Sequence, residues 1–188
     1  MPIVELHVLE GYGTDEKRRL HTALTDAVRL VVPASPDAIT VMIHEMKAAN
    51  YSRGGKQRKG APALGDAGEI VRAFLKTMEA REIEAARAFL AEDFAMFFPG
   101  AQPMHELETL IKWATQRYRF VKKAYLGFDV MQSSGPEVLV YCRGTLSGEW
   151  LDGTPFENIR FIDRFELVKG KISRQDVWND IAEVKAGL

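Results

Sequence analysis

The sequence has a single cysteine, no long apolar run and almost no net charge. The lone Cys142 cannot form an intrachain disulfide, which excludes a disulfide-stapled fold and favours a reducing compartment. With 25 lysines and arginines against 26 aspartates and glutamates, the chain has no general attraction to nucleic acid or to an anionic membrane. No apolar run reaches the length of a membrane span, and no basic-then-apolar leader is evident. We therefore expect a cytoplasmic protein with no membrane partner and no nucleic-acid partner.

Residues 2 to about 60 have the pattern of a small β-α-β unit. Apolar and polar residues alternate at 4–8 and again at 39–43, which predicts two strands with one buried face each. Between them, Thr14 is the predicted N-cap of a helix whose apolar residues recur at helical spacing. A strand, helix and strand of this length predict a right-handed parallel crossover. Because so small a unit leaves a sheet edge and a sheet face uncovered, we expect a homo-oligomer or packing onto other strands.

The stretch from Lys47 to Gly68 is rich in glycine and basic residues. Its cationic residues are Lys47, Arg53, Lys56, Arg58 and Lys59. This composition predicts a loop or hairpin followed by a linker, and cations without interleaved aromatic residues are weak evidence for a nucleic-acid surface. We predict a first domain over 1–60, a linker over 61–68 and a second domain over 69–188.

In the second half, helices come first and strands follow. Asp66 and Glu69 form a start that resembles a capping box, and short helices are predicted near 85–90 and 107–114. A short strand is predicted at 94–98. Four longer strands are predicted at 125–132, 137–150, 156–168 and 172–178. This order predicts an α+β fold in which helices pack on an antiparallel sheet.

One of these strands carries a carboxylate within an apolar row. The residues that share this face are Ile159, Phe161, Asp163, Phe165 and Leu167. Burial shifts an isolated carboxylate toward use as an acid or base, which makes Asp163 a candidate catalytic residue. The alternative is a structural ion pair with Arg143, Arg174 or another basic residue of an adjacent strand.

Pro2 is the first residue after Met1 and opens the first predicted strand. If Met1 is removed, the Pro2 nitrogen becomes a secondary amine that titrates near ~8, and lower when it is desolvated or placed beside cations. A base poised near neutrality suits proton transfer, so Pro2 is a second candidate catalytic residue. The alternative is that Pro2 only begins an edge strand.

The first half resembles the 4-oxalocrotonate tautomerase family. The matching segments are Pro2–Gly11 with Asp15–Lys17, Ile39–Met46 and Asn50–Gly55. The resemblance implies that Pro2 acts as general base or acid on enols or unsaturated carbonyl compounds, with no metal and no cofactor. It also implies dimers or larger rings in which neighbouring subunits complete the active site.

Four further residues are candidates for substrate binding in this half. Tyr51 falls where the family has an active-site aromatic residue, whereas Tyr12 and Thr40 stand where well-known members have substrate-binding arginines. Arg53 could supply a positive charge instead, and Tyr12 could donate a hydrogen bond to an enolate oxygen. The alternatives are packing for Tyr12 and a solvated loop position for Arg53. The two strand histidines His7 and His44 do not predict a metal site, because the spacing offers no third ligand.

The second half resembles the SnoaL-like polyketide cyclases and the wider nuclear transport factor 2-like fold. The residues that carry this resemblance are Phe89–Phe94, Pro99-Gly100, Asp163–Ile172 and Trp178–Asp180. It implies a cone of helices against a curved sheet, which encloses an apolar pocket. Four aromatic residues could line the pocket or belong to the core: Trp113, Tyr118, Tyr141 and Trp178.

We therefore predict a cofactor-independent tautomerase or isomerase that acts on a small-molecule substrate through Pro2, fused to a SnoaL-like ligand-binding domain. One alternative moves the activity to Asp163 in the second domain and leaves the first domain to build the assembly. Another is that both halves only bind ligand or form an oligomer.

Overall fold

The computed structural model describes residues 1–187 and separates into two compact units, Met1–Ala63 and a second unit that begins at Leu64. Among the described residues, no helix is long and apolar enough to cross a membrane. The predicted domain and linker boundaries (1–60, 61–68 and 69–188) stay a prediction.

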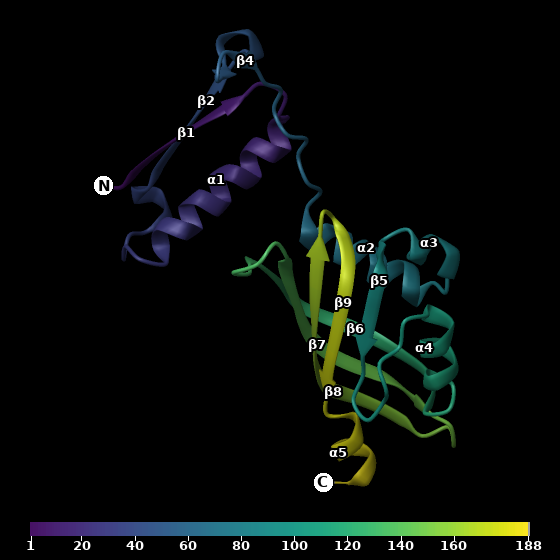
Figure 1. Ribbon diagram of the computed structural model, residues 1–188. Helices are drawn as coiled ribbons and strands as arrows, with labels where there is room; N and C mark the ends of the chain where they lie inside the picture. Colours follow the sequence, from purple (N-terminus) through teal and green to yellow (C-terminus); the bar gives the residue numbers. More distant parts are fainter. Residues whose placement is uncertain (188) are drawn as a thin grey trace. The chain divides into compact units, whose positions relative to one another are not determined.

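The first unit is a β-α-β crossover. Strands β1 (Ile3–Leu9) and β2 (Thr40–Met46) pair in parallel, and α1 (Thr14–Arg29) connects them and packs on their sheet (Figure 1). The predicted parallel pairing is confirmed. The helix cap was misplaced by one residue: Gly13 is the N-cap of α1 and Thr14 is its first residue. Two short 3₁₀ turns, η1 (Pro36–Ala38) and η2 (Ala48–Asn50), flank β2.

The basic stretch contains a hairpin of minimal length. Strands β3 (Ser52–Arg53) and β4 (Lys56–Gln57) pair in antiparallel fashion around Gly54 and Gly55. Both glycines have positive φ, +59° and +73°, as the two central residues of a type I′ turn require. A side chain at either position would be strained, which explains the Gly-Gly pair.

The first unit has no buried interior in a single chain. None of residues 1–63 is buried, and helix α1 has no buried residue on its apolar side. Several large apolar side chains of this unit are exposed, among them Ile3 at 59% and Leu30 at 87%. So much apolar surface left in water means that the unit has little stabilisation from burial within one chain.

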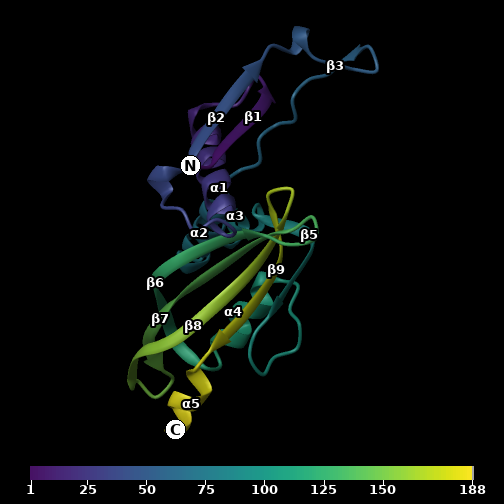
Figure 2. The same ribbon diagram turned by 90° about the vertical axis from the view of Figure 1, so that its left-hand side faces the viewer.

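The second unit is an α+β cone of three covering helices and a five-stranded sheet with strand order β5-β9-β8-β7-β6 (Figures 1 and 2). Its helices are α2 (Ala67–Glu79), α3 (Ile83–Arg87), α4 (Leu107–Ala114) and a terminal α5 (Ile181–Ala186). Its strands are β5 (Leu90–Phe97), β6 (Tyr118–Gln132), β7 (Val138–Trp150), β8 (Pro155–Val168) and β9 (Lys171–Asn179).

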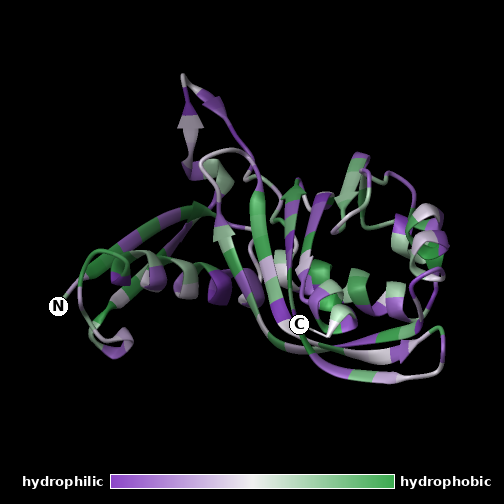
Figure 3. Ribbon diagram, turned by 90° about the horizontal axis from the view of Figure 1, so that it is seen from below, coloured by the Kyte–Doolittle hydropathy of each residue, from purple (hydrophilic) through white to green (hydrophobic). Residues whose placement is uncertain are grey.

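The predicted antiparallel pairing of the four long strands is confirmed, and a fifth strand makes the sheet mixed. Strands β6 to β9 pair in antiparallel order, but β5 joins β9 in parallel. The predicted helix at 85–90 ends earlier, at Arg87, because Leu90 already begins β5. Bands of hydrophobic and hydrophilic residues alternate along the long strands, as expected for a sheet with one covered face (Figure 3).

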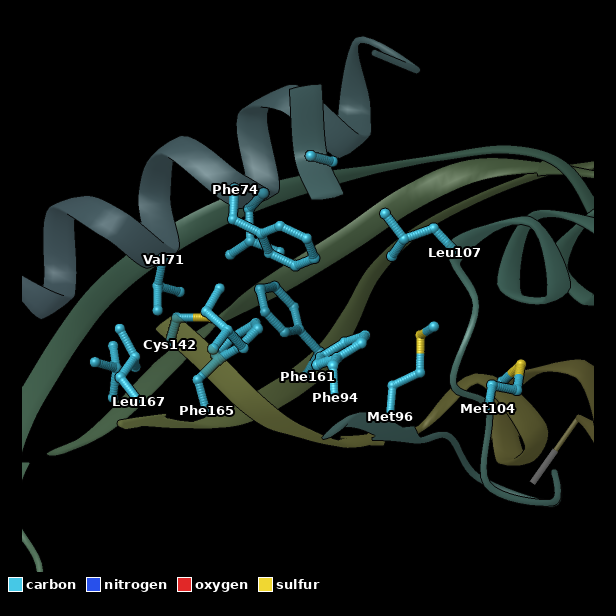
Figure 4. Packing of buried hydrophobic residues seen from close by; sticks show 14 of the residues in the cluster. Val71, Phe74, Phe94, Met96, Met104, Leu107, Cys142, Phe161, Phe165 and Leu167 are labelled. Atoms are coloured by element: carbon cyan, nitrogen blue, oxygen red, sulfur yellow. The ribbon is translucent and has the colours of Figure 1, made fainter. Parts of the chain in front are cut away.

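The core of the second unit lies between its helices and the concave face of its sheet. Val71 and Phe74 of α2 point toward Cys142 and Phe165 of the sheet (Figure 4), and the Phe74 and Phe165 rings meet edge to face at 6.1 Å. Asp66 caps α2 by accepting a hydrogen bond of 3.1 Å from the Glu69 amide. The helix therefore begins at the predicted residue and holds its apolar side against the sheet.

Candidate functional site

Pro2 and Thr40 lie together at one end of the first unit's sheet. The Thr40 amide donates a hydrogen bond of 3.0 Å to the Pro2 carbonyl, and Thr40 is the register partner of Ile3. Pro2 is half-buried, whereas Met1 is 86% exposed. The bond between Met1 and Pro2 is therefore on an open part of the unit, and Thr40 is the predicted substrate-binding residue whose backbone contacts Pro2.

The other predicted residues of this unit lie beyond the opposite end of the sheet. Tyr12 follows the carboxyl end of β1, whereas Tyr51 and Arg53 follow that of β2. Strands of this length span about 20 Å, so these side chains and Pro2 cannot meet on one substrate within one chain. The Tyr12 hydroxyl donates a hydrogen bond of 3.0 Å to the Ala61 carbonyl, and Arg53 is exposed on the hairpin.

The second unit contains a mostly apolar cavity of about 150 Å³ between α2, α4 and β6. Phenylalanine, leucine and methionine side chains form much of its wall. Its polar lining residues are Glu79, Arg81, Tyr118, Lys123, Tyr125 and Gln175. A cavity of this volume accommodates a molecule about the size of benzene.

Asp163 lies behind this cavity and is fully buried, in the apolar row predicted for β8. Its Oδ2 atom accepts a hydrogen bond from the Lys123 ammonium and a longer one, 3.4 Å, from the Gln175 amide. Its Oδ1 atom is buried and has no hydrogen-bond partner among the described residues. Lys123 and Gln175 both line the cavity, so hydrogen bonds through these two side chains connect the carboxylate to the cavity wall.

The Lys123 side chain extends across strand β7 to Asp163, and a glycine on β7 allows β6 to lie close to it. Asp163 is the register partner of Cys142, and Gly144 follows on the same face of β7. A Cβ atom at Gly144 would lie 1.9 Å from the Ala124 carbonyl oxygen, so only glycine permits β6 to bend this close. The Lys123 ammonium also lies 4.5 Å from the Phe161 ring centre, which is a cation–π contact.

The surroundings of the pair favour neutral forms of the neighbouring groups. Burial, together with the nearby Asp163, raises the pKa of the Cys142 thiol to about 12. Burial also raises the pKa of Tyr125, with smaller contributions from Cys142 and Asp163. The pKa of Tyr118 is raised by burial as well. Both tyrosines therefore offer the cavity a neutral hydroxyl that can donate a hydrogen bond.

The ion-pair partners suggested for Asp163 lie elsewhere. Arg143 pairs with Asp129, and Arg174 pairs with Asp176 at 2.9 Å. The actual partner, Lys123, belongs to the next strand but one in the sheet. The sequence offered a signal for it, because Lys123 alternates with the apolar Val121 and Tyr125 on one face of a strand.

Two aromatic residues expected to line the cavity lie on the opposite face of the sheet, so this expectation was wrong. Tyr141 is the register partner of Arg164, and Trp178 is the register partner of Ile162. Even-numbered residues of β8 point away from the core, and Trp178 is 53% exposed.

The other two expected aromatic residues lie on the cavity side. Tyr118 lines the cavity directly. Trp113 supports its wall, because its ring lies 5.3 Å from that of the lining residue Phe98. Of these two aromatic residues, Tyr118 therefore supplies the cavity with a hydroxyl donor, and the other hydroxyl donor is Tyr125.

The first unit matches the family model described as tautomerase enzyme, over residues 2–59. A probable tautomerase of Staphylococcus saprophyticus is 38% identical over 58 residues, which are 31% of this chain and 95% of that relative. The 2-hydroxymuconate tautomerase of Bacillus subtilis is 39% identical over 57 residues, which are 30% of this chain and 92% of that relative. The similarity thus spans nearly the whole length of both relatives.

The second unit matches the model described as SnoaL-like domain, over residues 71–175. A crystal structure of an NTF2-like protein of unknown function from Burkholderia pseudomallei gives a TM-score of 0.53 at 17% identity, over 65% of this chain and 97% of that chain. TerC, crystallised with polyporic acid, gives 0.52 at 16% identity, over 64% of this chain and 95% of that chain. At these identities the likeness establishes the fold alone.

Proposed function

The chain belongs to the tautomerase family over residues 2–59 and to the SnoaL-like family over residues 71–175, and from this we propose that it is a cofactor-independent tautomerase or isomerase. The observation that carries the proposal is the similarity to tautomerases over 92–95% of their length, with Pro2 at the head of β1. In this reaction the free Pro2 amine removes a proton from an enol or from the carbon next to a carbonyl, and then returns it to another atom of the same substrate.

The substrate is an enol with at most one carboxylate. Tyr12 and Thr40 stand where well-known members of the tautomerase family have arginines, so a dicarboxylate would lack its partners. Thr40, whose amide is bonded to the Pro2 carbonyl, carries the hydroxyl that would donate a hydrogen bond to the developing enolate oxygen. Arg53 of a neighbouring copy is the cation that would hold one carboxylate.

A homo-oligomer is part of this proposal. Pro2 lies about 20 Å from the end of the sheet that carries Tyr51 and Arg53, and the first unit has no buried residue in one chain. Both observations support an assembly in which another copy covers the apolar surface and contributes the missing side chains.

The test begins with the mass of the purified, untagged chain, which should be lower by one methionine. Pro2→Ala should then lose at least a hundredfold in the rate of ketonisation of phenylenolpyruvate, whereas Asp163→Asn should retain the rate. A chain that keeps Met1 and still catalyses the reaction would refute a role for the Pro2 amine.

A second candidate function belongs to the second unit and rests on the buried Lys123–Asp163 pair beside an apolar cavity. In this alternative the pair performs acid–base chemistry on a ring-sized ketone or phenol, as an isomerase, cyclase or hydrolase, and the first unit serves assembly. The same two variants distinguish the candidates, because activity lost in Asp163→Asn and kept in Pro2→Ala would assign the chemistry to the second unit.

A further inference from the structure

Three side chains that bind metals in other proteins gather on one face of the first unit's sheet. Glu5 and His7 are two residues apart on β1, so they point to the same face. His44 of β2 is the register partner of His7. The parallel pairing thus supplies the third ligand that the spacing in the sequence does not reveal.

The geometry of the three residues suits a single ion. The two imidazole rings are stacked, with centroids 4.8 Å apart and planes inclined by 18°. One ligand atom from each of Glu5, His7 and His44 lies within 4.8 Å of the other two. Two ligands on one tetrahedral zinc ion lie roughly 3.3 Å apart. To bind one ion, the exposed side chains would close this separation and turn the two stacked rings so that their nitrogen lone pairs converge.

The charge on this face also favours a cation. The other residues of the two strands on this face are Ile3, Leu9, Thr40, Met42 and Met46, and none of them carries a charge. The Glu5 carboxylate therefore faces no lysine or arginine of either strand. A bound cation would have this carboxylate as its only charged ligand.

We propose that Glu5, His7 and His44 form a zinc site. Two imidazoles of borderline hardness and one carboxylate suit zinc better than calcium or magnesium, which prefer oxygen ligands. Three protein ligands leave a fourth position open for water or for a group from another molecule. The site is separate from Pro2, because His7 lies five residues further along the strand, about 16 Å away.

The test uses the untagged full chain after treatment with EDTA, titrated with Zn²⁺ alone by calorimetry. The expected result is one zinc per chain, with affinity at least tenfold weaker in His7→Gln and in His44→Gln. His21→Gln is the matched control, because His21 is an exposed histidine on α1 outside the cluster. Glu5→Gln keeps the size of the side chain, and it should weaken binding by removing the only negative ligand.

Two further measurements separate loss of the site from loss of the fold. Zinc should raise the unfolding temperature of the wild type, since it binds the folded state, and should leave that of the His7→Gln/His44→Gln double variant unchanged. Co²⁺ in place of zinc should give the visible absorption of a four-coordinate site. Unchanged zinc affinity in the double variant, an equal loss in His21→Gln, or a stoichiometry below one zinc per chain would overturn the proposal.

Discussion

At the scale of single residues, the second unit depends on the pairing of Lys123 with Asp163. The carboxylate is fully buried, whereas the lysine side chain retains 22% of its exposure. Removal of either partner leaves a charge behind, but the two charges differ in their access to water. The two single variants are therefore expected to differ in stability.

Lys123→Met should lower the free energy of unfolding by about 3–5 kcal/mol, because it leaves a buried carboxylate unpaired. Asp163→Asn should cost less, about 1–3 kcal/mol, because the lysine can still reach water. Urea unfolding followed by tryptophan fluorescence reports on this unit alone, since all three tryptophans lie in it. Lys122→Met, an exposed neighbour, is the control. A larger loss in Asp163→Asn than in Lys123→Met would contradict this assignment.

Cys142 should make the second unit less stable in alkali. Its raised pKa of about 12 means that the unfolded chain releases the thiol proton from about pH 9, while the folded chain retains it. Stability therefore falls as the pH rises through this window, by about 1.4 kcal/mol per pH unit for one proton. The measurement is the urea midpoint between pH 8 and 10, compared with Cys142→Ala. An equal slope in that variant would exclude the thiol as the cause.

At the scale of elements, patterns of local periodicity and the parallel pairing of β1 with β2 were predicted correctly, whereas the pairing of β5 with β9 was not predicted. The strand-helix-strand of the first unit and the buried row of β8 follow from spacing alone. Strand β6 begins at Tyr118, well before the predicted 125. The prediction missed its first residues because Lys122 and Lys123 interrupt the apolar pattern. The presence of Lys123 in this apolar pattern is explained by its ion pair with Asp163.

The candidate site was predictable from the sequence only where a local pattern marked the residue. Asp163 was found because it breaks an apolar row, which is a local signal. Tyr141 and Trp178 were assigned to the cavity by residue type, although their position in the strand register points them outward. The Glu5–His7–His44 group could not be found by spacing, since His44 comes from the far side of the crossover.

The close approach of β6 to β7 should make Gly144 intolerant of any side chain. Gly144→Ala places a Cβ atom 1.9 Å from the backbone oxygen of Ala124, which rotation of a side chain cannot relieve. We expect a loss of about 3 kcal/mol in the free energy of unfolding, measured by tryptophan fluorescence in urea. Ser147→Ala, on the exposed face of the same strand, should change stability by less than about 0.5 kcal/mol. Equal stability of the two variants would contradict this expectation, because it would mean that β6 and β7 can move apart to accommodate the Cβ atom without cost.

At the scale of the whole molecule, the distance between Pro2 and the far end of its sheet would make the proposed tautomerase activity a property of the assembly. Activity per chain on phenylenolpyruvate should therefore fall on dilution, in step with dissociation observed by mass photometry. Constant activity per chain at concentrations where only monomers remain would contradict a shared site. The Asp163→Asn variant should follow the same curve, because its change lies in the other unit.

The parallel pairing of β5 with β9 has a consequence for the order in which the chain folds. Strand β5 occupies 90–97 and its partner 171–179, so the edge of this sheet closes only when the last strand has been synthesised. The first unit is complete by residue 63, and the register partners of its two strands, such as Ile3 and Thr40, are 37 residues apart. During synthesis on the ribosome, the first unit is therefore available to associate with other copies while β5, which carries the core residues Phe94 and Met96, still lacks its partner strand.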